Sequence, residues 1–290
     1  MRYRLGLMAL LALHAVPALA QSIVVEGVLS PAWVERGGRL APLAVGMQLG
    51  DRDRIRTGPG ARALLRLAEG SAVKLGENAM LELDGVADRR DAGVERLFTA
   101  SLDVVRGAFR FTTGIFGKHA AGREVKIRVS TVTAGIRGTD LWGKAADDRD
   151  IVCLIEGRIG VEHGGQGFEM AEPLSFFIAP RKEKPLPVAR VDMKQLEQWA
   201  AETEIQGGSG GAHRVGRYQV DASVSPDQKT ALAAYDTLRA AGYPAVLHPV
   251  KTESGYEYRV RIQQLLTRQD AQAAVEKIKT LGLAEAAVSK

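Results

Sequence analysis

The sequence contains one cysteine, Cys153, among its 290 residues. A single cysteine excludes an internal disulfide, even in an oxidising compartment. Cys153 stands in the apolar run "DIVCLIEG", and small apolar thiols of this kind are usually buried. We therefore expect a structural strand residue rather than a reactive thiol.

Long hydrophobic runs are also missing. The most apolar segment, residues 5–16, falls short of the roughly 20 residues that a membrane helix needs. Arg2 and Arg4 precede it, and Ala18-Leu19-Ala20 follow it as an A-x-A cleavage site, which is typical of an export signal. No cysteine stands at this site to carry a lipid anchor. We expect residues 1–20 to be a signal peptide cleaved near Ala20, and the mature protein to be soluble in the periplasm with no membrane span.

Neither sign of charge dominates the mature chain. Acidic and basic side chains balance over residues 21–213, and basic ones are in slight excess over residues 214–290. An excess this weak argues against nucleic acid as a partner.

The residue groupings of metal sites are lacking as well. The histidines after the signal show no H-E-x-x-H spacing, and no second cysteine is present to complete a metal site. These histidines are His119, His163, His213 and His248. The sequence predicts no metal and no cofactor.

Two sequence features resemble catalytic groups without their context. Ser209 satisfies the pattern G-x-S-x-G in "GGSGG", but a nucleophile of that type needs a strand before it and a helix after it. Asp147, Asp148 and Asp150 stand together in a polar turn, whereas an acid–base pair must be separated across a cleft. We expect a protein that is not an enzyme.

Short strands dominate residues 21–190. The segment "LLRLAEGSAVKLGENAMLELDG" repeats every eight residues as an in-out-in strand followed by a turn. The repeat aligns Leu65, Val73 and Leu81, and likewise Leu67, Leu75 and Leu83. We predict an all-β body, and a β-meander and a solenoid-like sandwich both fit the pattern.

The segment "VSTVTAGIRGTDLWG", residues 129–143, interrupts a strand pattern with two glycines. A phosphate-binding loop would need more glycines, a following helix and usually a lysine. We expect the corner of a sheet, in which Gly135 and Gly138 supply backbone freedom and Trp142 returns to the core. Arg137 is either a structural hydrogen-bond hub or a partner contact.

A helix and a linker follow the β body over residues 191–213. Asp192 caps the helix, and Met193, Leu196 and Trp199 share one stripe that either docks on the β body or receives a partner. The stretch "QGGSGGAH", residues 206–213, has the composition of a flexible tether.

Residues 214–290 change to the order strand, helix, strand, strand, helix, strand. Ser225 and Gly242 mark the ends of the first helix, and Thr267 with Asp270 forms a capping box for the second. Two right-handed β-α-β crossovers of this length predict an α+β split β-α-β domain (βαββαβ), with helices on one face of the sheet and the other face bare.

The β body resembles the FecR domain family over about residues 40–165. The resemblance lies in "GMQLGDRDRIRTGPGARALLRLAEGSAVKL", in the segment from Val129 to Trp142, and in "LIEGRIGVEH". It implies an extracytoplasmic β scaffold for protein contacts. Known members relay signals from an outer-membrane transporter through a membrane helix and a cytoplasmic segment, and this sequence shows neither.

The C-terminal segment resembles a SPOR domain, a module that binds septal peptidoglycan and favours glycan strands stripped of stem peptides. The resemblance lies in the element order, in "RYQV", and in "YEYRVRI" followed by "TRQDAQAAVEKI". The family's V-Q-V-G-S-F and G-P-F positions hold "VDASV" and Gln263-Gln264-Leu265 here, so the ligand contacts of the family do not transfer directly.

Strand alternation selects the residues that could touch sugar. If Tyr218, Val220, Ala222 and Val224 pack under the helices, their neighbours face outward, and the same rule applies to the third strand. The predicted glycan-binding residues are Gln219, Asp221, Ser223, Arg259 and Arg261. Guanidinium groups hold carboxylates bidentately, and a stripped glycan strand exposes muramyl carboxylates.

The sequence thus predicts an exported, non-enzymatic cell-envelope protein of four parts. These are a signal peptide (1–20), a FecR-like all-β domain (21–190), a helix and linker (191–213), and a SPOR-like peptidoglycan-binding domain (214–290). The expected partners are denuded glycan strands, at the cell-division site, and a protein that meets the FecR-like domain. The alternative is a periplasmic sensor or adaptor that binds a regulatory partner and has little affinity for the wall.

Overall fold

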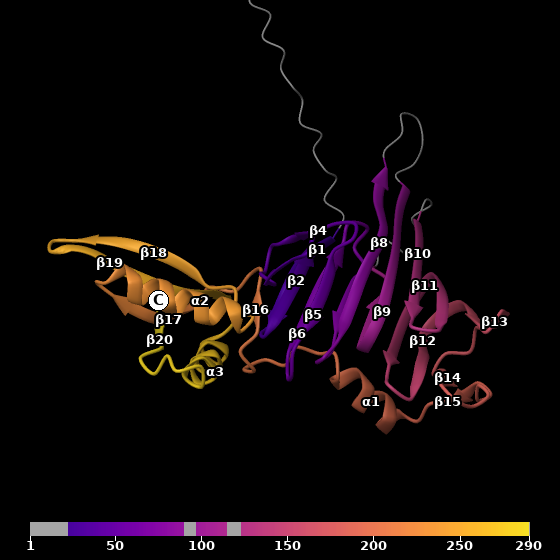
Figure 1. Cartoon of the computed structure of the whole chain (residues 1–290). Helices are drawn as coiled ribbons and strands as arrows, with labels where there is room; N and C mark the ends of the chain where they lie inside the picture. The colour runs from indigo at the N-terminus through magenta and orange to yellow at the C-terminus, as the bar shows by residue number, and fades with distance from the viewer. Residues whose placement is uncertain (1–22, 90–96, 115–122, 290) are drawn as a thin grey trace, which may run out of the picture.

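The computed structural model describes residues 23–89, 97–114 and 123–289, so the predicted signal peptide lies outside the described residues. The chain forms a large β body followed by a smaller domain of strands and helices (Figure 1). Within these described ranges, hydrogen bonds join all 20 strands into one continuous network. The predicted fold class, an all-β body joined to an α+β domain, is confirmed.

The β body is a sandwich of two sheets. The first sheet has the order β3 (Arg39–Pro42), β2 (Ala32–Arg36), β5 (Arg54–Thr57), β8 (Met80–Arg89), β9 (Leu97–Thr112), β10 (Arg123–Val129), β11 (Val132–Ala145), β12 (Arg149–His163) and β13 (Gln166–Met170). The second sheet has the order β1 (Ile23–Leu29), β6 (Arg62–Leu67), β7 (Ala72–Leu75), β9, β11, β12, β14 (Ser175–Pro180) and β15 (Ala189–Arg190). The short strand β4 (Gln48–Leu49) pairs with the start of β1.

Three long strands, β9, β11 and β12, belong to both sheets, and each bends at a glycine. Residues 132–136 of β11 pair with β10, and residues 140–145 pair with β9. The bends fall at Gly107, Gly138 and Gly157, whose φ angles are 87°, 63° and 93°. A side chain is strained in this left-handed region. The expected sheet corner therefore exists, and Gly138 is the residue that makes it possible.

Gly135 plays a different part from the one that we predicted. Its φ angle lies outside the left-handed region, and a Cβ atom added to it would meet no heavy atom within 4 Å. It pairs with Lys126 on one side and with Gly160 on the other, in regular register. The backbone at this position does not require a glycine.

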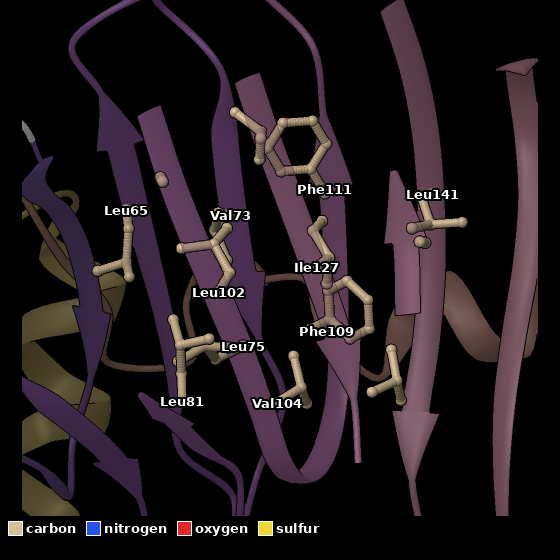
Figure 2. Close-up of a cluster of buried hydrophobic side chains, with 14 of the residues drawn as sticks. Leu65, Val73, Leu75, Leu81, Leu102, Val104, Phe109, Phe111, Ile127 and Leu141 are labelled. Atoms are coloured by element: carbon tan, nitrogen blue, oxygen red, sulfur yellow. The ribbon is translucent and has the colours of Figure 1, made fainter. Parts of the chain in front are cut away.

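The core of the body lies between the two sheets. The repeat of eight residues places its leucines and valines there, because Leu65, Val73, Leu75 and Leu81 are each at most 1 % exposed. Figure 2 shows side chains from β6, β7, β8, β9, β10 and β11 meeting in this layer. Strands β6 and β7 form an antiparallel hairpin as in a meander, whereas β8 crosses to the first sheet. The segment is therefore a hairpin and a crossover, not a stack of solenoid rungs.

Helix α1 (Met193–Ala201) packs on the outer side of the second sheet. Asp192 caps it by accepting a hydrogen bond from the backbone of Gln195, as predicted. Leu196 and Trp199 pack there against Trp142 and Cys153, in a cluster separate from the main core. Leu196 and Trp199 of the predicted stripe thus dock on the body, whereas Met193 is 58 % exposed. Trp142 lies beneath the helix rather than between the sheets.

The C-terminal domain is the expected split β-α-β fold. Its sheet has the order β18 (Val246–Thr252), β19 (Gly255–Leu265), β17 (Tyr218–Ser225) and β20 (Ala287–Ser289). Helices α2 (Gln228–Ala240) and α3 (Arg268–Lys279) enclose a core with Val220, Leu238 and Val260.

The two helix starts differ in how well the sequence predicted them. The capping box of Thr267 and Asp270 is present at the start of α3. The cap of α2 is Asp227 rather than Ser225, because the Asp227 side chain accepts from the backbone of Lys229 and Thr230.

The glycine-rich stretch at residues 206–213 is structured, which contradicts the expectation of a flexible tether. It ends in β16 (Ala212–His213), which pairs with β1 through Val28 and with β19 through Leu265. Gly210 donates its N–H to Asp270, and the carbonyl of Ser209 accepts from the ammonium group of Lys277. Glycine at these positions permits close approach of the backbone to α3 rather than chain flexibility. Composition alone does not distinguish these two uses of glycine.

Candidate functional site

The bare face of the C-terminal sheet is the surface that the sequence singled out. Antiparallel partners share a face, and Asp221 lies directly opposite Arg261 and Ala287. Gln219 lies two residues before Asp221, so it points to the same face of the sheet, and it pairs with Ser289. The structure therefore brings Gln219, Asp221, Arg259 and Arg261 together on the face that the helices do not cover; this group is called the bare face below.

Ser223 does not belong to the bare face. A register shift between Asp221 and Ser223 makes Ser223 the partner of Val260, which is fully buried on the helix side. The bulge inserts one residue and reverses the alternation after it. The same shift turns Val224 outward, opposite Arg259, and leaves it 42 % exposed. Strict alternation wrongly placed both residues.

The start of β17 also departs from the alternation rule. Tyr218 is predicted to be inward but is 40 % exposed. A second register shift lies between Tyr218 and Val220, where Gln264 of β19 adopts a φ of 62°. Nothing in the sequence marks either bulge.

The charged groups of the bare face are paired with one another. The Nε of Arg261 donates to Oδ1 of Asp221 at 2.6 Å, and the Nε of Arg259 donates to Oε1 of Glu257 at 2.6 Å. A terminal nitrogen of Arg259 lies 3.9 Å from Oδ2 of Asp221. The four side chains are partly exposed, between 12 % and 35 %. Two cations and two anions thus form one chain of ion pairs across β17 and β19.

Strand β18 adds residues that the sequence reasoning missed. Val246 lies opposite Arg261, His248 opposite Arg259, and Val250 opposite Glu257. The Nε2 of His248 is 3.3 Å from the side-chain amide nitrogen of Gln263. The alternation in "VLHPV" could have indicated these positions. Val224 and Val246 now border the charged centre with exposed apolar surface.

The β body meets the C-terminal domain away from the bare face. The N–H of Ala32 donates to the carbonyl of Gly242, at the end of α2, at 3.1 Å. The N–H of Arg214 donates to the carbonyl of Glu26 at 3.0 Å. In Figure 1 the hairpin of β18 and β19 points away from the β body. The bare face is therefore an accessible surface in this arrangement of the two domains.

The first sheet of the body carries a separate surface that is hollowed into a cleft. A cleft of about 480 Å³ is lined by charged residues of neighbouring strands. Glu35, Arg54 and Glu82 are consecutive partners across β2, β5 and β8, and Asp103 and Arg128 continue the row. The Nε of Arg54 donates a hydrogen bond to Oε1 of Glu82 at 2.8 Å, and Arg128 forms an ion pair with Asp103. Nothing in the sequence pattern indicated this row.

Within the described ranges, no group of three or more His, Cys, Asp or Glu side chains could hold a metal ion. Over the same residues, no helix is long and apolar enough to cross a membrane. Cys153 is fully buried, and burial raises the pKa of its thiol to about 12. A thiol with so high a pKa is a poor nucleophile at neutral pH.

Comparison with known families agrees with the two resemblances. The FecR protein family model matches residues 53–160, and the SPOR domain model matches residues 215–289. The chain therefore carries a FecR domain followed by a SPOR domain. Both are binding or regulatory domains rather than catalytic ones, and both are typical of cell-envelope proteins. The SPOR domain implies binding of peptidoglycan, and the FecR domain suggests a regulatory role with a protein partner.

Solved structures and curated proteins add little. Two crystal structures of a candidate anti-sigma factor from Parabacteroides distasonis are each 14% identical to this chain, cover 78% of it and 90% of their own length, and give a TM-score of 0.40. A similarity of this size is too weak to support an argument. No curated protein matches the chain.

Proposed function

We propose that the chain is an exported, non-enzymatic protein of the periplasm that docks on the glycan strands of peptidoglycan through its bare face. The FecR domain then presents a protein-binding surface at that place, which for a SPOR domain is the division site. The observation that carries the proposal is the accessible cluster of polar donors and acceptors on β17, β18 and β19, bordered by apolar Val224 and Val246. Sugars offer hydroxyl and acetamido groups to such donors.

Co-sedimentation with purified sacculi tests the proposal. Sacculi treated with an amidase are rich in bare glycan, and the mature protein is expected to sediment with them more than with untreated sacculi. The double variant Arg259→Ala, Arg261→Ala should sediment less. Its control is the double variant Lys229→Ala, Arg268→Ala, which removes the same charge from exposed positions on the helices. Absent sedimentation of the unaltered protein with both preparations would reject wall binding, and equal sedimentation with both would reject docking on bare glycan strands.

A second candidate function is a sensor or adaptor that binds a regulatory protein through its FecR domain. The charged cleft on the first sheet favours it, because this cleft opens on the surface of the body and its lining residues all come from the body. Chemical cross-linking of the full chain in the periplasm is the test. Removing residues after 205 would strip β16 from β1 and expose a new sheet edge, so the full chain is the proper bait. Specific cross-links that map to β8 and β10 would support the adaptor, and cross-links confined to the C-terminal domain would contradict it.

A further inference from the structure

Both arginines of the bare face already hold a carboxylate of the protein. Arg261 uses its Nε on Asp221, and Arg259 uses its Nε on Glu257, each at 2.6 Å. Hydrogen bonds between ions at such distances are strong. The guanidinium edges that contain Nε are therefore occupied before any ligand arrives.

The remaining donors are the N–H groups of the terminal nitrogens, since a guanidinium carries five N–H donors in all. A ligand carboxylate that reached these donors would also approach the carboxylate of Asp221, which lies within 3.9 Å of both arginines. Like charges at short range repel, and this repulsion offsets the attraction to the guanidinium. Asp221 and Glu257 together cancel the charge of Arg259 and Arg261.

Uncharged ligand groups meet no such opposition. A hydroxyl or acetamido oxygen accepts from a terminal N–H, and a hydroxyl can donate to a carboxylate oxygen at the same time. Val224 and Val246, 42 % and 39 % exposed, border the charged centre. They provide apolar surface against which the C–H faces of sugar rings can pack.

We propose that the bare face recognises the hydroxyl and acetamido groups of an amino-sugar polymer and not its carboxylates. This inference rests on the proposed wall binding, and it replaces the expectation that Arg259 and Arg261 grip muramyl carboxylates. An oligomer of N-acetylglucosamine, which carries no carboxylate, is accordingly a ligand of the same face.

The first test is competition and salt dependence, with the full mature protein. N-acetylglucosamine oligomers should displace the protein from amidase-treated sacculi. Binding to these sacculi should weaken by less than about two-fold when ionic strength rises from about 0.01 M to about 0.15 M, although the Debye length shortens from about 30 Å to about 8 Å. A loss of about ten-fold over this range, or failure of the oligomers to compete, would overturn the inference.

The second test removes the compensating charge. Glu257→Gln leaves Arg259 without its close carboxylate. Binding to glycan strands that expose muramyl carboxylates, as in amidase-treated sacculi, should therefore increase and become sensitive to salt. Binding of the N-acetylglucosamine oligomer should stay within about two-fold of the original, because its oxygens carry no charge to be attracted. Glu253→Gln, in the exposed turn of the same hairpin, makes the same change of net charge and should alter neither. Unchanged carboxylate binding and salt response in Glu257→Gln would count against the inference.

The outcomes separate this inference from the proposed function. Absence of sedimentation with amidase-treated sacculi rejects wall binding itself. Sedimentation that is abolished by moderate salt and resists the neutral oligomer leaves wall binding intact and rejects only the preference for uncharged groups.

Discussion

The indole rings of Trp142 and Trp199 stack in parallel, with their centroids 4.6 Å apart and their planes within 5°. Trp142 comes from β11 and Trp199 from α1, so the stack joins the helix to the outer side of the second sheet. Phe176 of β14 meets Trp199 edge-on at 5.7 Å. The helix is thus held by an aromatic cluster of defined geometry.

Removing this contact should release α1. Trp199→Ala is expected to lower the free energy of unfolding by about 2–3 kcal/mol, since it deletes a large, half-buried aromatic side chain. Met193→Ala, at an exposed position of the same helix, should change it by less than about 0.5 kcal/mol. Urea titrations of both variants provide the measurement. Equal stability of the two variants would show that the helix does not depend on the stack.

The glycines at and beside the sheet corner should differ in their response to substitution. Gly135→Ala is expected to keep or raise stability by up to about 1 kcal/mol, because its Cβ position is open and its φ is ordinary. Gly157→Ala should be strongly destabilising, because its φ is 93° and the new Cβ would lie 2.4 Å from the carbonyl oxygen of Gly138. Thermal unfolding of both variants tests this contrast, which fails if their midpoints fall together.

Two helix-ending glycines provide a matched test of the contact between domains. Gly242 follows α2 with a φ of 79°, and a Cβ there would lie 2.6 Å from the ring of Trp33 in the β body. Gly282 follows α3 with a φ of 89°, and a Cβ there would meet nothing within 4 Å. Both alanine variants carry the backbone strain, but only Gly242→Ala should separate the domains. Small-angle scattering should show a larger radius of gyration for that variant alone, and similar radii for both would argue against a fixed interface.

The stability of the protein should fall at alkaline pH through Cys153. Burial raises the pKa of this thiol from its ordinary value of 9.0 to about 12, so below pH 9 the thiol is protonated in both the folded and the unfolded state and this stability is fully present. As pH rises from about 9 towards 12, the unfolded state releases the proton and the folded state keeps it, so stability is lost at up to about 1.4 kcal/mol per pH unit. Burial also raises the pKa of Tyr243, so the comparison is with Cys153→Ala. The difference in stability between the two proteins should shrink as pH rises, and a constant difference would contradict the assignment.

The sequence predicted what periodic burial determines. The repeated leucines and valines of β6, β7 and β8 are buried as expected, because an alternating strand has only one way to bury its apolar side. The capping box at Thr267 was also predictable, since it depends on two residues three positions apart.

The sequence did not predict what depends on distant partners. The bulge after Asp221 follows from pairing with β19, and it moved Ser223 and Val224 to unexpected faces. The glycine-rich stretch at 206–213 is ordered by α3 and by β1, neither of which adjoins it in sequence. The ion pair of Arg261 with Asp221 likewise needed the strand register, which no local pattern contains.

Strand β16 has a mechanical consequence. Because Ala212 pairs with Val28 on one side and with Leu265 on the other, a load applied to the C-terminal sheet passes through backbone hydrogen bonds directly into the second sheet of the body. We therefore expect the two halves of the molecule to reorient as one body, so that the orientation of the C-terminal sheet determines the orientation of the β body.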